Sequence, residues 1–130
     1  MAGPVAIDPT RKSRRTAEFG RATQADIPGF LAIMQVLHSE PTSAAFARLL
    51  TKRLRDGDHI PLAHLFEEIS VLAGHRLIPE ELLFDAFAFD LYWDELKDTV
   101  LQVRNTTNNP KFCENFEAVA VDARSYRSDR

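Results

Sequence analysis

The sequence has few of the residues that mark a functional site or form a covalent cross-link. Its single cysteine, Cys113, excludes an intramolecular disulfide and a zinc site built from cysteines. Only five glycines occur in 130 residues, and no G-x-G-x-x-G or G-x-x-x-x-G-K-[ST] motif is present, which excludes the usual phosphate-binding loops. A Ser/His/Asp arrangement with recognisable spacing is also missing. We therefore expect no cofactor and no metal.

Long apolar runs are absent as well. No window of about 18 consecutive apolar residues exists, which excludes a transmembrane helix. Near the N-terminus, Pro4, Asp8 and Pro9 interrupt the apolar stretch that a signal peptide would need. The sequence therefore predicts a cytoplasmic protein.

Composition and length favour one folded domain. The chain carries 16 Lys and Arg against 19 Asp and Glu, for a net charge of −3, and 45% of its residues are apolar. Both values are ordinary for a globular protein, and the length suits one domain with a core of its own. We expect a basic, disordered arm over 1–22, a folded domain over 23–127 and a frayed end over 128–130.

The predicted arm concentrates positive charge. Its cations face only two acidic residues, Asp8 and Glu18. A solvated leader is the favoured interpretation, because blocks of like charge rarely fold alone. The alternative is a salt-sensitive contact with nucleic acid or an anionic membrane. The cations are Arg11, Lys12, Arg14, Arg15 and Arg21.

The rest of the chain reads as five helices and no strand. Apolar residues recur at spacings of three and four, and Asp26, Pro61, Gly57 and Gly74 supply plausible starts and stops. The fold class is therefore all-α, a single bundle of about five helices. The predicted ranges are 26–39, 42–56, 61–74, 79–105 and 109–126.

The fourth range carries the strongest pattern. Its apolar stripe is unbroken from Leu82 to Val103 and predicts one long central helix that spans the domain. Four large aromatic residues in the stripes are expected to form the core, with Trp93 buried. They are Phe66, Phe89, Trp93 and Phe116.

Three small groups of residues could carry chemistry. His64 beside Glu67 and Glu68 could offer metal ligands, although the phase of the helix favours an exposed flank. Arg53 and His59 resemble a pair found in helical ribonucleases, in which the His acts as the base and the Arg holds the phosphate. Gly57 between them favours a simpler interpretation, a basic helix end followed by a loop.

Cys113 is predicted in the first turn of the last helix, where a dipole lowers a thiol pKa. Its apolar neighbours favour a small buried core residue instead. The acidic run from Glu80 to Asp98 is most simply a solvated helix face, with an acidic docking surface as the alternative.

From Leu65 to about Arg124 the chain resembles an uncharacterised bacterial helical family, a domain of unknown function. The resemblance implies a helical fold and no particular reaction. Many relatives carry an N-terminal membrane helix, which is not carried over to this chain. The matching stretches are Leu65-Phe66-Glu67-Glu68-Ile69, Leu77-Ile78-Pro79-Glu80-Glu81-Leu82-Leu83, Tyr92-Trp93 with Leu96, Arg104, Asn109-Pro110 and Asn115-Phe116-Glu117.

The charged residues among these matches fall in three different predicted helices: Glu67 or Glu68, Arg104, and Glu117. A partly buried Glu–Arg network that fixes helix register is favoured over a binding site.

Taken together, these patterns favour a small non-enzymatic helical module that binds another protein. The alternatives are a ribonuclease-like enzyme using Arg53 and His59, and a nucleic-acid or membrane-surface binder using the arm. A homo-oligomer is left open.

Overall fold

The computed structural model describes residues 20–128 of the chain. Within this range the regular structure is six α-helices and one short 3-10 helix, with no strand, so the all-α prediction is confirmed. The elements are η1 (Gln24–Asp26), α2 (Ile27–Leu37), α3 (Thr42–Leu50), α4 (His59–Gly74), α5 (Glu80–Ala86), α6 (Phe89–Thr106) and α7 (Glu114–Ser128).

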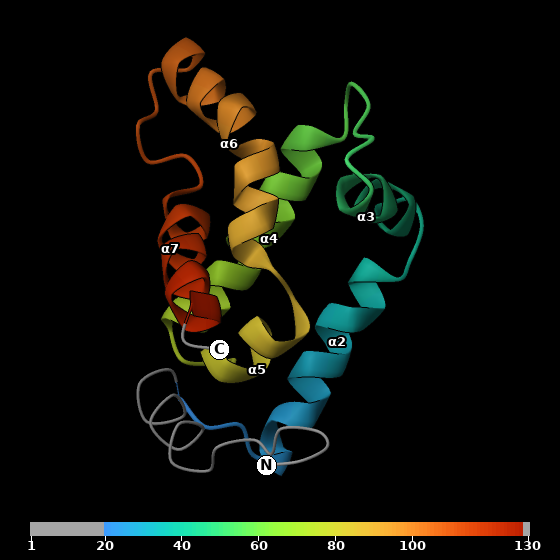
Figure 1. The fold of residues 1–130 in the computed structure, drawn as a ribbon, viewed down its shortest axis with the longest axis vertical. Coiled ribbons are helices and arrows are strands. Elements are labelled where there is room, and N and C mark those ends of the chain that lie inside the picture. Colours follow the sequence, from blue (N-terminus) through green and yellow to red (C-terminus); the bar gives the residue numbers. More distant parts are fainter. Residues whose placement is uncertain (1–19, 129–130) are drawn as a thin grey trace, which may run out of the picture.

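Three helices, α4, α6 and α7, pack together to form the centre of the fold (Figure 1). Each contributes a fully buried phenylalanine: Phe66 from α4, Phe89 from α6 and Phe116 from α7. The Phe66 ring centroid lies 5.2 Å from that of Phe89 and 5.4 Å from that of Phe116. The three helices therefore pack against each other through these rings, as the apolar stripes predict.

Trp93 is partly buried rather than enclosed, which differs from the prediction. Its ring stands edge-on to Phe116, with centroids 5.2 Å apart. The guanidinium carbon of Arg104 lies 5.9 Å from the centroid of the indole ring. A charged side chain that must reach water therefore covers part of Trp93, and this leaves the indole at the rim of the core.

The predicted single helix over 79–105 is wrong. Phe87 is extended, with φ −136° and ψ 144°, and it separates α5 from α6. The extended residue turns its ring toward the N-terminal helices, where the Phe87 centroid lies 6.1 Å from that of Phe30 and 6.5 Å from that of Phe46. These aromatic contacts favour the break, although no glycine or proline marks it.

Two further helix boundaries differ from the sequence prediction. The helix predicted over 42–56 ends at Leu50, and Arg53 and Arg55 lie in the connection that follows. The helix predicted from 109 begins at Glu114, because Cys113 has a φ of 58° and cannot continue a right-handed helix.

Helices α3, α4 and α6 all end in the same way. At α3, the Arg53 amide donates to the Arg48 carbonyl and the Lys52 amide donates to the Leu49 carbonyl. This is the Schellman pattern, which needs a left-handed residue just past the helix. That residue is Lys52 at α3, Arg76 at α4 and Asn108 at α6, with φ of 58°, 60° and 53°. The predicted stop glycines, Gly57 and Gly74, do not take this role.

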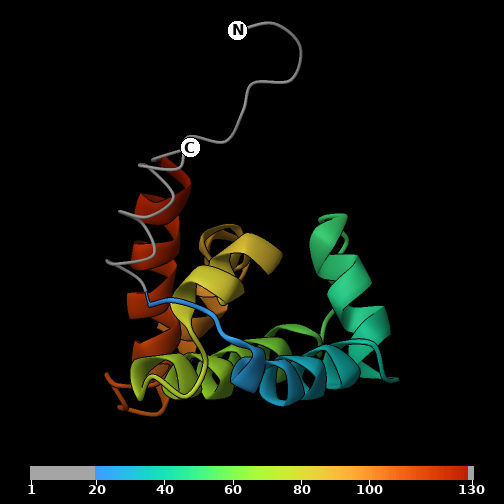
Figure 2. The ribbon, with the colours of Figure 1, turned by 90° about the horizontal axis from the view of Figure 1, so that it is seen from below.

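Helices α2 and α3 lie at one side of the molecule, away from α7 (Figure 1). Seen from below, α2 remains at an edge of the molecule (Figure 2). One of their contacts with the centre is Phe46, whose ring stands edge-on to Tyr92 with centroids 5.6 Å apart. The α2–α3 pair is therefore a peripheral attachment to the α4–α6–α7 centre.

Candidate functional site

Helix α2 is apolar in composition but largely uncovered. Its sequence, IPGFLAIMQVL, holds no charged residue and only one polar side chain, yet only Ile33 and Leu37 are buried. Ile27, Leu31 and Val36 are 52%, 56% and 46% exposed. A helix that is apolar on every side is normally enclosed on every side. Its exposure therefore marks a surface that another molecule can cover.

An apolar groove of about 520 Å³ lies between α2 and α4. The glutamate Glu68 is its one charged lining residue. Leu72 and Leu77 are exposed along it, at 37% and 64%. The lining residues are Gly29, Ala32, Ile33 and Val36 from α2, Leu65, Glu68, Ile69 and Leu72 from α4, and Leu77 and Ile78 from the following connection.

Gly29 allows a close approach between α2 and the connection from α4 to α5. A Cβ at this position would lie 3.1 Å from the Ile78 Cδ1 atom, which is tighter than an ordinary contact. Ile78 itself is buried. The absence of a side chain on Gly29 therefore brings the two walls of the groove together at this end.

Arg104 and Glu117, two of the charged residues singled out in the sequence, form an ion pair. The Arg104 Nη2 atom donates to the Glu117 Oε1 atom at 2.9 Å, and the Arg104 Nε atom donates to the Phe112 carbonyl at 2.8 Å. The Arg104 side chain is 15% exposed and that of Glu117 is 45% exposed. Arg104, on α6, thus holds both the α6–α7 connection and α7 itself.

Glu67 caps α7 instead of pairing with Arg104. Its two carboxylate oxygens accept hydrogen bonds from the Phe116 amide at 2.8 Å and from the Asn115 Nδ2 atom at 2.7 Å. A carboxylate at a helix N-terminus satisfies free amides and complements the dipole. A side chain from α4 therefore caps α7, and sequence spacing gives no signal of it.

Glu68 and His64 face solvent together. The His64 Nδ1 atom lies 3.4 Å from the Glu68 Oε1 atom, and both side chains are more than 60% exposed. Across residues 20–128, no three His, Cys, Asp or Glu side chains come together as metal ligands. His64 and Glu68 thus lie on the exposed flank that the sequence favours. Glu68 takes no part in the Arg104–Glu117 ion pair.

Cys113 is buried, with its Sγ atom 3.6 Å from the Ala63 carbonyl oxygen. Burial in this apolar setting raises the pKa of the thiol to about 11. The thiol is therefore protonated at neutral pH and a poor nucleophile. Cys113 lies before α7 and not in its first turn. The predicted position in the helix dipole, which would lower the thiol pKa, is therefore wrong.

Arg53 and His59 are not brought together. Arg53 is exposed, His59 opens α4, and within the described residues no hydrogen bond or ion pair joins them. The connection is instead fixed by Arg48 and Asp58. Two nitrogens of the Arg48 guanidinium donate to the two Asp58 oxygens at 2.7 and 2.8 Å.

Asp58 is a buried carboxylate held by three donors. The Arg55 amide adds a third hydrogen bond at 2.9 Å. The Arg48 guanidinium and this amide hold the pKa of Asp58 well below its usual range. Sequence spacing does not predict this pair, whose members stand ten residues apart across a connection.

Three carboxylates of the acidic run on α5 and α6 bond to side chains of α7. Asp90 is buried and accepts a hydrogen bond from the Arg127 Nε atom at 3.0 Å, while Asp94 pairs with Arg124. The Tyr126 hydroxyl donates to Asp85 at 2.7 Å. These three carboxylates therefore link helices to each other within the fold.

The sequence profile of a family described as Domain of unknown function (DUF4760) matches residues 7–123. The chain belongs to the DUF4760 family. The predicted resemblance to a domain of unknown function is therefore confirmed, and the match extends beyond Leu65 to include α2 and α3. No curated protein and no solved structure matches the chain significantly.

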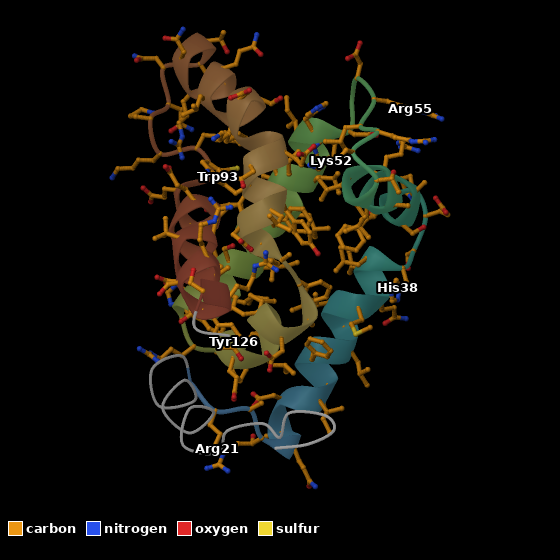
Figure 3. The ribbon with its side chains drawn as sticks, viewed as in Figure 1. Arg21, His38, Lys52, Arg55, Trp93 and Tyr126 are labelled. Atoms are coloured by element: carbon orange, nitrogen blue, oxygen red, sulfur yellow. The ribbon has the colours of Figure 1, made fainter. Side chains whose placement is uncertain are left out.

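The DUF4760 match begins inside the segment predicted to be a basic arm. Arg11, Lys12, Arg14 and Arg15 lie outside the described residues. Arg21 is exposed, and Figure 3 places it at the opposite end of the molecule from Lys52 and Arg55. These described cations do not gather into one basic surface. Among the described helices, none is long and apolar enough to span a membrane.

Proposed function

We propose that this DUF4760 chain is a non-enzymatic protein-interaction module whose binding surface is α2 together with the groove between α2 and α4. The observation that carries the proposal is the exposure of a wholly uncharged helix beside an apolar groove. Contiguous apolar surface of this kind marks interaction sites in soluble proteins. A helix with an apolar face is the occupant that a groove between two helices accepts.

Two properties of the surface support a protein partner over a small substrate. The groove is open along α2, and its apolar surface continues past the groove to Ile27 and Leu31. Only Glu68 among the lining side chains carries a charge, and it is 64% exposed. A catalytic pocket would instead bring several polar groups together around the reacting atoms.

The ribonuclease-like alternative has weaker support. Within the described residues no hydrogen bond joins Arg53 to His59, and the Arg48–Asp58 pair holds the connection that carries Arg53. A base and a phosphate-binding group must converge on one substrate to act together.

Photo-crosslinking in the native host tests the proposal. A photoreactive amino acid is placed at Leu77 in the groove or, as a control, at Val121 on α7. These residues are 64% and 66% exposed, so the two probes meet solvent equally. We expect protein adducts from Leu77 and few from Val121. Equal adduct formation at both positions, or none at either, contradicts the proposal.

A further inference from the structure

Gly20, the first described residue, lies beside the start of α5. It lines a hollow of about 290 Å³ together with Arg21, Arg76 and Glu80. Figure 3 shows Arg21 at the same end of the molecule as Tyr126 of α7, whose hydroxyl bonds to α5. Residues 1–19, which lie outside the described range, therefore join the fold at the end where α5 meets α7.

Two carboxylates at this end lack a bonded cation. Glu80 opens α5 and Asp122 lies on α7, and neither side chain forms a hydrogen bond or ion pair with another described residue. Burial and the neighbouring Asp122 carboxylate raise the pKa of Glu80, and Arg76 offsets this only in part. Like charges that approach each other in this way are unfavourable unless a cation joins them.

The nearby arginines of α7 are already engaged. Arg124 pairs with Asp94, and Arg127 pairs with the buried Asp90. The cation that Glu80 and Asp122 require must therefore come from elsewhere in the chain or from a partner.

A run of cations precedes Gly20 within a short length of chain. Arg15 stands five residues before it and Arg11 nine, which an extended chain spans with roughly 17–32 Å. The DUF4760 profile begins at residue 7, so it includes this run in the family domain. A leader that merely extends into solvent gives no reason for that match. The cations are Arg11, Lys12, Arg14 and Arg15.

We propose that residues 11–15 of this chain dock on the end of the fold formed by α5 and α7, where their cations pair with Glu80 and Asp122. Opposite charge guides the two surfaces together, and the tether at Gly20 keeps the arm at an effective concentration on the order of millimolar. Exposed ion pairs are individually weak and are screened by salt. The docked arm is therefore released reversibly as the salt concentration rises.

This contact goes beyond the proposed function and is independent of it. Neither Glu80 nor Asp122 lines the groove between α2 and α4. Failure of either proposal therefore leaves the other unchanged.

Nucleic acid is a less suitable partner for the same cations. Surfaces that bind nucleic acid are strongly positive, whereas the chain as a whole carries a net charge of −3. Glu80 and Asp122 stand where the arm joins the fold, and their charge repels phosphates.

Limited trypsin digestion of the full-length chain tests the proposal, because trypsin cleaves after Lys and Arg. Mass spectrometry follows cleavage at residues 11–15. At low salt, we expect Glu80→Gln/Asp122→Asn to be cleaved there several-fold faster than the parent chain, since its arm is released. The ratio of the two rates should approach one near about 1 M salt, where the screening length is only about 3 Å.

Asp56→Asn/Asp98→Asn is the matched control, because it removes the same charge from two exposed carboxylates elsewhere in the fold. It should be cleaved at the parent rate. Circular dichroism checks that both double variants keep the helical content of the parent. Equal cleavage of the parent and Glu80→Gln/Asp122→Asn overturns the proposal. Equally faster cleavage of both double variants also overturns it, because net charge would then govern the arm.

Carbodiimide crosslinking identifies the paired residues directly. The reagent joins an amine to a carboxylate in contact with it, and Lys12 is the one lysine of the arm. We expect a link from Lys12 to Glu80 or Asp122 within the monomer, and we expect Lys12→Arg to lack it. A parent chain without this link, or with the link only between two chains, overturns the proposal. Protection of the arm from trypsin only when a single-stranded oligonucleotide is added assigns the cations to nucleic acid and overturns it as well.

Discussion

Arg104 near the end of α6 and Glu117 in α7 are joined by a hydrogen-bonded ion pair of 2.9 Å. The same guanidinium holds the Phe112 carbonyl and lies beside the Trp93 ring. Arg104→Ala should lower the free energy of unfolding by about 2 kcal/mol, since it removes charge-assisted hydrogen bonds from a largely buried group. Glu117→Ala should cost less than about 1 kcal/mol, because that carboxylate is half exposed.

Denaturant unfolding of the two single variants and the double variant measures this coupling. We expect the double variant to be little less stable than Arg104→Ala alone. Lys97→Ala, on the exposed face of α6, serves as the control. Strictly additive losses would contradict a shared interaction between Arg104 and Glu117.

Glu67 and Glu68 provide a matched pair of adjacent residues with different roles. Glu67 caps α7 and Glu68 faces solvent beside His64. Glu67→Ala should destabilise the protein by about 1–2 kcal/mol, as the loss of a helix cap does. Glu68→Ala should stay within about 0.5 kcal/mol of the parent, as exposed surface substitutions usually do. Thermal unfolding of both variants checks the difference, and equal losses would argue against the cap.

Asp58 should make the stability of the protein depend on acidity. Its pKa lies well below the ordinary value near 3.8 because of Arg48 and the Arg55 amide. The ionised carboxylate therefore stabilises the folded state at pH values above about 3.8. This contribution is lost as the pH falls below that value. Asp58→Asn should cost about 1–3 kcal/mol at neutral pH.

Urea unfolding from neutral pH down to about pH 2 tests the sign of this effect. The gap between the parent chain and Asp58→Asn should narrow as the pH drops below about 4. A gap that stays constant across the whole range would show that the carboxylate charge is unimportant.

Lys52 adopts a left-handed conformation that favours glycine. Lys52→Gly should therefore raise the free energy of unfolding by about 0.5–1 kcal/mol, as relief of the Cβ strain exceeds the added chain entropy. Lys97→Gly, inside α6, should lower it by about 1 kcal/mol. Calorimetric melting of both variants measures the contrast, and destabilisation by Lys52→Gly would contradict the Schellman assignment.

Phe66 and Trp93 should differ in the cost of truncation. Phe66 has no exposed surface and contacts rings from α6 and α7, whereas Trp93 is partly buried. Phe66→Ala should cost about 3–5 kcal/mol, and Trp93→Ala about 2 kcal/mol because part of its ring already meets solvent. Denaturant titration checks the order, and a larger loss from Trp93→Ala would contradict it.

The sequence could predict the helical class, because spacings of three and four residues mark the buried faces of α4, α6 and α7. It could not predict the break at Phe87. The apolar spacing continues across the break, and the cause is contact with Phe30 and Phe46, which are far away in the chain. Periodicity reports which residues are apolar along a helix, and it carries no information on where two helices change direction.

The candidate site was the least predictable part. The apolar residues of α2 look like the buried stripe of a core helix, and only the three-dimensional packing shows that Ile27 and Leu31 are uncovered. The contacts of the charged residues could be predicted from the sequence only in part. Arg104 does meet Glu117, but Glu67 bonds to the start of α7, and no spacing rule connects residues 49 positions apart.

The placement of α2 at the edge of the molecule has a consequence for how this domain can diverge. The central rings belong to α4, α6 and α7, whereas Ile27, Leu31 and Val36 of α2 are exposed. Under the proposed function, substitutions at exposed positions of α2 such as Leu31 alter affinity or partner choice while the melting temperature stays nearly constant. Under that proposal, recognition and folding are encoded by different helices, so selection can adjust one without sacrificing the other.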